Sequence, residues 1–270
     1  MEKRIIGRGI LAGALAGVLA FVWAKIFIEP IVGRAIDFED GTAAAHEAME
    51  TATGGHSHAE GGELFSRGIQ TTVGMGFGVL AFSVALGALF AVVFCVVYGR
   101  FSSLSARALS VLVAGAMLIS LWIVPALKYP PNPPATSLDE TITQRALLYL
   151  LMVGLSVLLM VAAVYLGHQL VPKLGVWNAT LAGGAAYIVA IAIVMLVLPT
   201  IDETPGPMLD DAGVIVFPGF PAVDMYEFRL YALGTQVIIW TTIGLVSAAL
   251  LSRLLDGRRA DTDRFQGAGA

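Results

Sequence analysis

Charged residues are scarce in this chain, since Asp, Glu, Lys and Arg make up 13% of its 270 residues. An ordinary soluble domain carries roughly 25%. Hydrophobic residues reach 57%, and the mean hydropathy is +0.80. Cysteine occurs once, at Cys95, so no disulfide can form within the chain. This composition places the chain among membrane proteins.

Recognisable catalytic motifs are also missing. The sequence has no G-x-x-x-x-G-K-[ST] phosphate loop, no H-E-x-x-H and no G-x-S-x-G. His168 stands alone near the end of an apolar run, and no nucleophile has a base beside it. We therefore expect no enzymatic activity, no tightly bound cofactor and no nucleic acid partner.

Long apolar runs are what the chain has instead. A helix crosses the hydrocarbon core with ~20 residues, and these runs do not alternate as barrel strands would. We predict an all-α integral membrane protein, with one transmembrane domain over residues 1–255 and a disordered cytoplasmic tail over 256–270. Six windows are long enough to span: 9–28, 73–98, 108–127, 146–167, 179–198 and 231–251.

The basic residues indicate an orientation. With both ends of the chain in the cytoplasm, ten of the 16 Lys and Arg residues fall inside and five outside, while Lys25 lies at an outer helix end. Sixteen of the 20 Asp and Glu residues then fall outside. We expect an acidic outer face that concentrates cations.

The three outer loops resemble one another. Each is expected to begin where a proline near a charge closes a helix, at Pro30, Pro125 and Pro199. Each ends with an arginine, followed or preceded closely by glutamine: Arg67 with Gln70, Arg145 with Gln144, and Arg229 with Gln236. This pattern suggests three helical hairpins with a weak internal repeat. The alternative is that proline and charge simply punctuate membrane helices.

The first outer loop, residues 37–66, combines acidic residues with three of the four histidines. Imidazole and carboxylate groups bind Co²⁺, Ni²⁺ and Zn²⁺, and His46 and Glu50 share one face if their stretch is helical. A glycine-rich loop offers no rigid second shell, so we expect transient capture or an ordinary solvated acidic loop. The candidate metal-capturing residues are His46, Glu50, His56, His58, Glu60 and Glu63.

A second set of polar residues lies within a turn or two of the outer helix ends, where a charge costs less than at mid-bilayer. We expect Glu29 and Glu203 to pair with arginines of neighbouring hairpins. Such a set either lines a cation path or locks the helix bundle. Its members are Glu29, Arg67, Gln70, Lys128, Arg145, Glu203, Arg229 and Gln236.

Three further features bear on packing. Gly9, Gly13 and Gly17 let another helix approach closely, either within this chain or from a partner subunit. The segment 130–134, Pro-Pro-Asn-Pro-Pro, is expected to shape the outer mouth as a rigid extended piece. The apolar patch 214–217 is too short to span, and we expect it at the interface or capping the bundle.

Short motifs along the chain resemble the CbtA family. They extend from about Gly7 to Leu251 and are specific as a set rather than singly. The matching residues are Glu29-Pro30-Ile31, Ala35-Ile36, Glu39, Ser66-Arg67, Gln70, Lys128-Tyr129-Pro130, Asn132-Pro133-Pro134, Thr141-Ile142, Arg145, Trp177-Asn178-Ala179, Leu198-Pro199, Glu203, Pro205, Phe228-Arg229-Leu230, Gly234-Thr235-Gln236 and Trp240.

The resemblance implies the membrane subunit of a cobalt transporter linked to cobalamin biosynthesis, in the cell membrane of a bacterium or archaeon. It also implies a small companion, CbtB, with one membrane helix and a histidine-rich end. Here the tract His56-Ser57-His58 lies in the chain's own loop. The family supplies no established transport residues to carry over.

Two functions of different classes follow. The first is uptake of Co²⁺ or a similar divalent metal, with the ion as substrate and the lipid bilayer, a companion subunit or a second copy as partners. The second is a scaffold or assembly subunit that moves no metal and binds a small membrane protein through Gly9, Gly13 and Gly17. The acidic outer face argues against transport of anions.

Overall fold

The computed structural model describes the whole chain apart from residues 1, 53–66, 101–103, 137–138, 203 and 268–270. Helices dominate, three short stretches of them are π-helical (η), and one small hairpin is β. In chain order the elements are α1 (Glu2–Trp23), η1 (Ala24–Ile28), α2 (Glu29–Ala52), α3 (Arg67–Ile69), η2 (Gln70–Gly74), α4 (Met75–Val97), α5 (Ala106–Leu118), η3 (Ile119–Ile123), α6 (Val124–Lys128), α7 (Asp139–Val197), β1 (Met208–Leu209), β2 (Ile215–Phe217) and α8 (Ala222–Gly267).

Within the described residues, five continuous helical stretches are long and apolar enough to cross a membrane. An all-α membrane protein is therefore confirmed in its broad class. The number of crossings, the three hairpins and the orientation stay predictions. The five stretches are Glu2–Thr51, Thr71–Val97, Ala106–Lys128, Glu140–Val197 and Ala222–Leu255.

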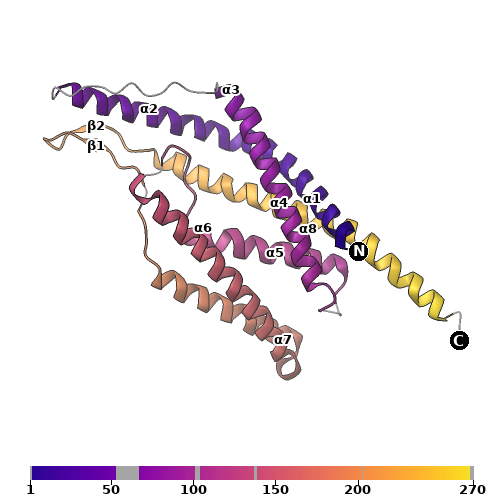
Figure 1. Cartoon of the computed structure of the whole chain (residues 1–270). Helices are drawn as coiled ribbons and strands as arrows, with labels where there is room; N and C mark the ends of the chain where they lie inside the picture. Colours follow the sequence, from indigo (N-terminus) through magenta and orange to yellow (C-terminus); the bar gives the residue numbers. More distant parts are fainter. Residues whose placement is uncertain (1, 53–66, 101–103, 137–138, 203, 268–270) are drawn as a thin grey trace. The chain divides into compact units, whose positions relative to one another are not determined.

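The stretch α7 is two helices joined at Gly175, whose backbone (φ 73°, ψ 166°) is not helical. After that residue the chain folds back beside itself (Figure 1). A Cβ on Gly183 would lie 2.9 Å from the Ala163 carbonyl oxygen, so the two halves touch backbone to backbone. The hydroxyls of Ser156 and Tyr187 join the halves by a 2.8 Å hydrogen bond. The predicted windows 146–167 and 179–198 lie in different halves of α7.

Pro30 does not close the first helix, and that expectation was wrong. A proline inside a helix lacks an N–H and clashes with the carbonyl four residues earlier. Ile26, four residues before Pro30, lies in η1, and Leu121, four before Pro125, lies in η3. A π turn closes its backbone hydrogen bond over five residues instead of four, so the helix continues past each proline. Pro125 and Pro199 do lie near helix ends, since α6 ends at Lys128 and α7 at Val197.

Half of the predicted flexible loop 37–66 is therefore helix, because α2 continues to Ala52. Alanine, glutamate and methionine favour helix over this stretch. The remainder, 53–66, lies outside the described residues. At the other end of the chain α8 extends to Gly267, where the sequence predicts a disordered tail from residue 256. Extending an existing helix costs far less than starting one.

Two compact units make up the chain, where the sequence predicts one domain over 1–255. The first unit comprises Met1–Lys25, Arg67–Ile119 and Gly234–Ala270, and the second comprises Ile26–Ser66 and Ser120–Leu233. Each is built from segments far apart in the sequence, and each is described by itself below.

Glycine contacts pack the first unit, in which α1 lies along α4 (Figure 1). A Cβ on Gly13 would lie 2.4 Å from the Ser83 carbonyl oxygen, and one on Gly87 would lie 2.2 Å from the Gly9 carbonyl oxygen. Gly17 meets Leu80 in the same way. The predicted glycine face is thus confirmed as packing within the chain. It is covered by α4, which favours packing within the chain over the alternative of a partner subunit.

The part of α8 from Gly234 onward completes the first unit. A Cβ on Gly244 would meet the Cβ of Ala114 in α5 at 2.9 Å. Trp240 and Ile243 are buried on the same helix. Arg8 of α1 donates from Nη1 to the Leu250 carbonyl oxygen at 2.8 Å. Small residues and a backbone-directed arginine therefore hold α8 against α1 and α5.

Among the described residues of the second unit, two apolar clusters stand out. One lies inside the α7 hairpin and includes Tyr129, Met152 and Ile191. The other joins α2 to the turn after β2 and to the start of α8. Its buried members are Ala35, Phe220 and Met225, with Phe38 packed against them.

Candidate functional site

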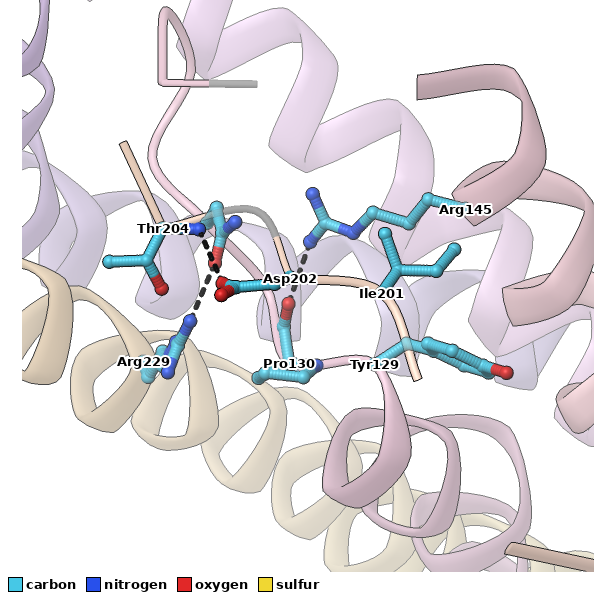
Figure 2. Close-up of a pocket in the computed structure, with 8 residues that line it drawn as sticks. Tyr129, Pro130, Arg145, Ile201, Asp202, Thr204 and Arg229 are labelled. Atoms are coloured by element: carbon cyan, nitrogen blue, oxygen red, sulfur yellow. Dashed lines mark hydrogen bonds between the residues drawn. The ribbon is translucent and has the colours of Figure 1, made fainter. Parts of the chain in front are cut away.

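A small polar pocket lies within the second unit (Figure 2). Three segments build it: the proline-rich turn after α6, the connection after α7, and the first turns of α8. Arg145 of α7 also reaches into it. The pocket is lined by Tyr129, Pro130, Asn132, Arg145, Ile201, Asp202, Thr204 and Arg229.

The proline-rich turn lines the pocket and leaves the carbonyl oxygens of Pro130 and Pro131 as acceptors for side chains. Prolines 130, 131, 133 and 134 lack amide hydrogens, so no helix or strand can use them as donors. The phenol of Tyr129 donates to the Pro199 carbonyl oxygen at 2.8 Å, which joins this turn to the end of α7. Burial raises the pKa of the Tyr129 phenol, so it stays protonated at neutral pH and acts as a donor.

Two arginines supply the donors that the turn lacks. Arg145 donates from Nη2 to the Pro130 carbonyl oxygen at 2.6 Å. Arg229 donates from Nη2 to Asn132 Oδ1 at 2.9 Å and from Nε to the Pro131 carbonyl oxygen at 3.3 Å. Both side chains are half-buried. Hydrogen bonds from a charged donor are stronger than neutral ones, so this pair fixes the turn relative to α7 and α8 within the unit.

The pocket also contains one described carboxylate. Asp202 lies between the two arginines in Figure 2, and its Oδ1 accepts a hydrogen bond from the Thr204 amide at 3.1 Å. Neither arginine comes within ion-pair distance of Asp202 among the described contacts. Two guanidinium groups repel a bare divalent cation, and a single carboxylate among the described side chains does not make a metal site. The pocket is suited to holding protein segments or a polar solute, rather than a free metal ion.

A second cleft of the same unit surrounds an ion pair. Arg34 of α2 donates to Asp224 Oδ1 of α8 through Nη2 at 2.7 Å and through Nε at 3.0 Å. Glu227 lies 3.8 Å from the same guanidinium. Asp37 and Phe38 line the cleft with the turn 218–221. Phe38 also contacts the rings of Phe217 and Phe220, with ring centroids 5.5 and 5.3 Å apart.

The residues of the apolar patch 214–217 differ in burial: one packs on α2 and the other three are exposed. Its last residue, Phe217, lies against Gly41 of α2, where an added Cβ would approach the ring within 2.5 Å. Val214, Ile215 and Val216 are exposed on the β1–β2 hairpin. The patch therefore covers α2 through one residue, and its other residues do not cap this unit.

The predicted outer-boundary residues are divided between the units. Glu29, Lys128, Arg145 and Arg229 belong to the second unit, and Gln236 belongs to the first, as do the backbones of Arg67 and Gln70. Glu203 and the side chains of Arg67 and Gln70 lie outside the described residues. The structure brings together Arg145 and Arg229. Their contacts hold the proline-rich turn, and both alternatives for this set, a cation path and a bundle lock, stay predictions.

The expected pairing of Glu29 with an arginine is not found among the described side chains. The ion pairs present there join Arg34 to Asp224 and Glu227, which sequence reasoning missed. A signal for them exists, because Ile31, Ala35 and Phe38 recur at helical spacing beyond Pro30. Recognising that helix would have placed Arg34 on a folded element.

The metal-capturing residues are only partly described. His46 and Glu50 are exposed side chains of α2, four residues apart, so the helical condition for their sharing a face is met. His56, His58, Glu60 and Glu63 lie in the segment outside the described residues. In the described part of the chain, no three His, Cys, Asp or Glu side chains are grouped as a metal site.

The comparison with protein families gives a match over most of the chain. Residues 2–252 match the family described as "Probable cobalt transporter subunit (CbtA)". No curated protein and no solved structure matches the chain. Because the match covers nearly the whole sequence, the chain belongs to the CbtA family, the probable cobalt transporter subunits.

Proposed function

We propose that this chain is the membrane subunit of an uptake system for a divalent transition metal, with Co²⁺ the first candidate and Ni²⁺ or Zn²⁺ the alternatives. Its membership of a family of probable cobalt transporter subunits carries the proposal. The five apolar helical stretches support a multi-pass protein of the cell membrane. The metal taken up would supply cobalamin biosynthesis, and a small one-helix companion would complete the transporter.

Metal capture and structural support fall to different residues in this proposal. The imidazole and carboxylate groups from His46 to Glu63 gather the ion, because they are its ordinary ligands. The arginine pocket does not, because two guanidinium groups disfavour a cation beside them. Arg145 and Arg229 instead hold the proline-rich turn in place.

The ion pair of Arg34 supports this separation of metal capture from structural support, because it joins α2 to the start of α8. α2 carries His46 and Glu50, and it leads directly into the histidine tract. The Arg34–Asp224 pair and the Phe38 ring contacts anchor this helix within the second unit. Ions gathered by His46 and Glu50 are thereby held on a folded helix of the second unit.

Accumulation of radioactive cobalt in cells tests the proposal. Cells that carry the gene should accumulate more cobalt from metal-poor medium than cells without it. His56→Ala combined with His58→Ala should reduce accumulation several-fold at low metal and little at high metal, since capture matters when the ion is scarce. The matched control is His168→Ala, which removes a histidine far along the sequence on α7. Equal accumulation with and without the whole protein would refute uptake.

Liposomes that contain the purified chain separate transport from scaffolding. Cobalt should enter when the chain and its companion are both present. Entry with the chain alone would mean that the chain holds the complete path. A complex that forms but moves none of Co²⁺, Ni²⁺ or Zn²⁺ would instead support the scaffold function.

Orientation can be tested with a single introduced thiol. Cys95→Ser removes the one native cysteine, and Ser57→Cys then places a thiol in the histidine tract. We expect a membrane-impermeant maleimide to label it in intact cells. Labelling only after the membrane is opened would place the tract in the cytosol, where it cannot gather ions for import.

A further inference from the structure

One end of the first unit is strongly basic, and the proposed uptake function does not use it. Four apolar helical stretches begin or end there. α1 begins at Glu2 and α5 at Ala106, while α4 ends at Val97 and the apolar stretch of α8 ends at Leu255. The sequence predicts this end to face the cytoplasm.

Hydrogen bonds place three of these helix ends at one level. Arg8 of α1 donates to the Leu250 carbonyl oxygen of α8 at 2.8 Å. Arg107 of α5 donates through Nε to Ser252 Oγ, also of α8, at 3.1 Å. The fourth helix joins them because α4 packs along α1 through Gly87 and Gly9. The charges on these four ends therefore belong to one surface of the unit.

Cations outnumber carboxylates on this surface. Glu2 is the one carboxylate among the described side chains of residues 2–8, 98–107 and 249–255. Most of the cations are exposed to the surroundings, and Arg8 is half-buried. They are Lys3, Arg4, Arg8, Arg100, Arg107 and Arg253. Arg100 also donates to the Val96 carbonyl oxygen, so part of its guanidinium closes the end of α4.

Arg107 is the best-positioned of these cations. Ser252, which accepts from its Nε, is 3% exposed and donates in turn to the Ala249 carbonyl oxygen at 3.2 Å. The guanidinium is therefore anchored on a buried hydroxyl. Its two terminal amino groups make no hydrogen bond with the part of the chain that the structure describes. A held guanidinium with free amino groups is a ready partner for a phosphate.

Exposed apolar side chains adjoin the charges. Leu11, Val96 and Val111 lie within about four residues of Arg8, Arg100 and Arg107, and they are 59%, 55% and 47% exposed. A soluble anion would need only the cations, whereas a lipid also needs a surface for its acyl chains. We propose that this end of the first unit binds the headgroups of anionic phospholipids, with Arg107 as the fixed phosphate contact and Lys3 and Arg4 beside it.

Lipid titration of the delipidated, detergent-purified full chain tests the proposal. Binding is measured by native mass spectrometry and by the shift in unfolding temperature. Phosphatidylglycerol should bind at least about tenfold more tightly than phosphatidylcholine with the same acyl chains, because each nearby cation favours the anionic lipid. Lys3→Gln, Arg4→Gln and Arg107→Gln together should reduce this preference to within about twofold. Lys173→Gln, an exposed basic residue of the second unit, should leave it unchanged.

Two further arms keep the test decisive if the triple variant folds poorly. Ser252→Ala leaves every charge in place but frees the Arg107 guanidinium, and it should weaken the preference roughly threefold. Water-soluble glycerol phosphate should neither bind at comparable concentration nor displace the lipid. Equal binding of the two lipids, an undiminished preference in both variants, or competition by glycerol phosphate would each overturn the proposal. None of these outcomes depends on metal transport.

Discussion

The two units hold their helices together by different means. In the first, α1 and α4 meet at glycines whose backbones approach so closely that no Cβ fits between them. In the second, arginine donors bind the carbonyl groups of a proline-rich turn, and aromatic rings close the junction with α2. The first relies on the shape of small residues, and the second on charged donors and aromatic contacts.

The difference follows from the solvent that each contact meets. Apolar side chains gain little by leaving lipid for another helix, so helices in the hydrocarbon associate through close packing of small residues. Arginine is too costly at mid-bilayer but is tolerated near a helix end, where it can serve unpaired carbonyl groups. The first unit should therefore be sensitive to added volume, and the second to lost donors.

Adding volume at Gly87 is expected to have the largest effect. Gly87→Val places atoms where the Gly9 carbonyl oxygen lies 2.2 Å from the position of a Cβ. Two backbones cannot move apart without separating α1 from α4. We expect a loss of about 3 kcal/mol or more in the free energy of unfolding, measured by titration with SDS in detergent micelles.

Gly78→Ala is the matched control for that experiment. It lies on the same helix, but a Cβ there has open space around it. The control should retain wild-type stability. If both variants are equally stable, the glycine contacts do not hold this unit together.

Removing the donors of the second unit comes next in size. Arg145→Met and Arg229→Met should each cost about 1.5–3 kcal/mol, because each leaves carbonyl groups of the turn without a charged donor. Arg229→Lys should recover part of the loss, since an ammonium group can make one of the two bonds. Lys128→Met serves as the control, as Lys128 is half-buried and forms no ion pair with the described residues. Equal losses in Lys128→Met and Arg229→Met would contradict the lock.

The sequence predicts the broad fold well because apolar runs report directly on burial in lipid. It also predicts the small-residue face of α1, since Gly9, Gly13 and Gly17 are only useful to a close neighbour. The failure at Pro30 has a physical cause, because the π turn that accommodates a proline has no simple residue signature. The division into two units depends on contacts between distant segments, which periodicity does not report.

The candidate site is predictable in its residues but not in its partners. Arg145, Arg229 and the turn 130–134 all stand out as charge or proline at helix ends. Their hydrogen bonds join positions up to 98 apart in the sequence, and nothing local indicates that backbone carbonyl groups, rather than Glu29, accept them. The sequence marks Asp202 and Asp224 only as parts of an acidic outer face, because a lone carboxylate in a loop carries no pattern.

The hydrogen bond of Tyr129 should make the stability of the second unit depend on pH. Tyr129→Phe removes the bond to the Pro199 carbonyl oxygen and should cost about 0.5–1.5 kcal/mol at neutral pH. Burial raises the pKa of this phenol in the fold, so the wild type binds the proton more tightly when folded. Its advantage is complete below pH about 10 and is lost as the pH rises through the raised pKa. The stability gap between wild type and Tyr129→Phe should therefore narrow from pH 8 to pH 11, as seen in unfolding titrations at each pH. A constant gap would exclude the phenol as the titrating donor.

The smallest expected effects come from two buried serines, one in each unit. Ser83 lies in the glycine contact of α4, and its hydroxyl has no hydrogen-bond partner in the described part of the chain. Ser156 shares a 2.8 Å hydrogen bond with Tyr187 in α7. Alanine should therefore act in opposite directions. Ser83→Ala should be neutral or stabilise by up to ~1 kcal/mol, whereas Ser156→Ala should destabilise by ~1 kcal/mol, because it leaves the Tyr187 hydroxyl without its partner. If both substitutions destabilise by the same amount in SDS titration, the Ser83 hydroxyl has a partner in the folded protein, and the first unit depends on polar contacts as the second does.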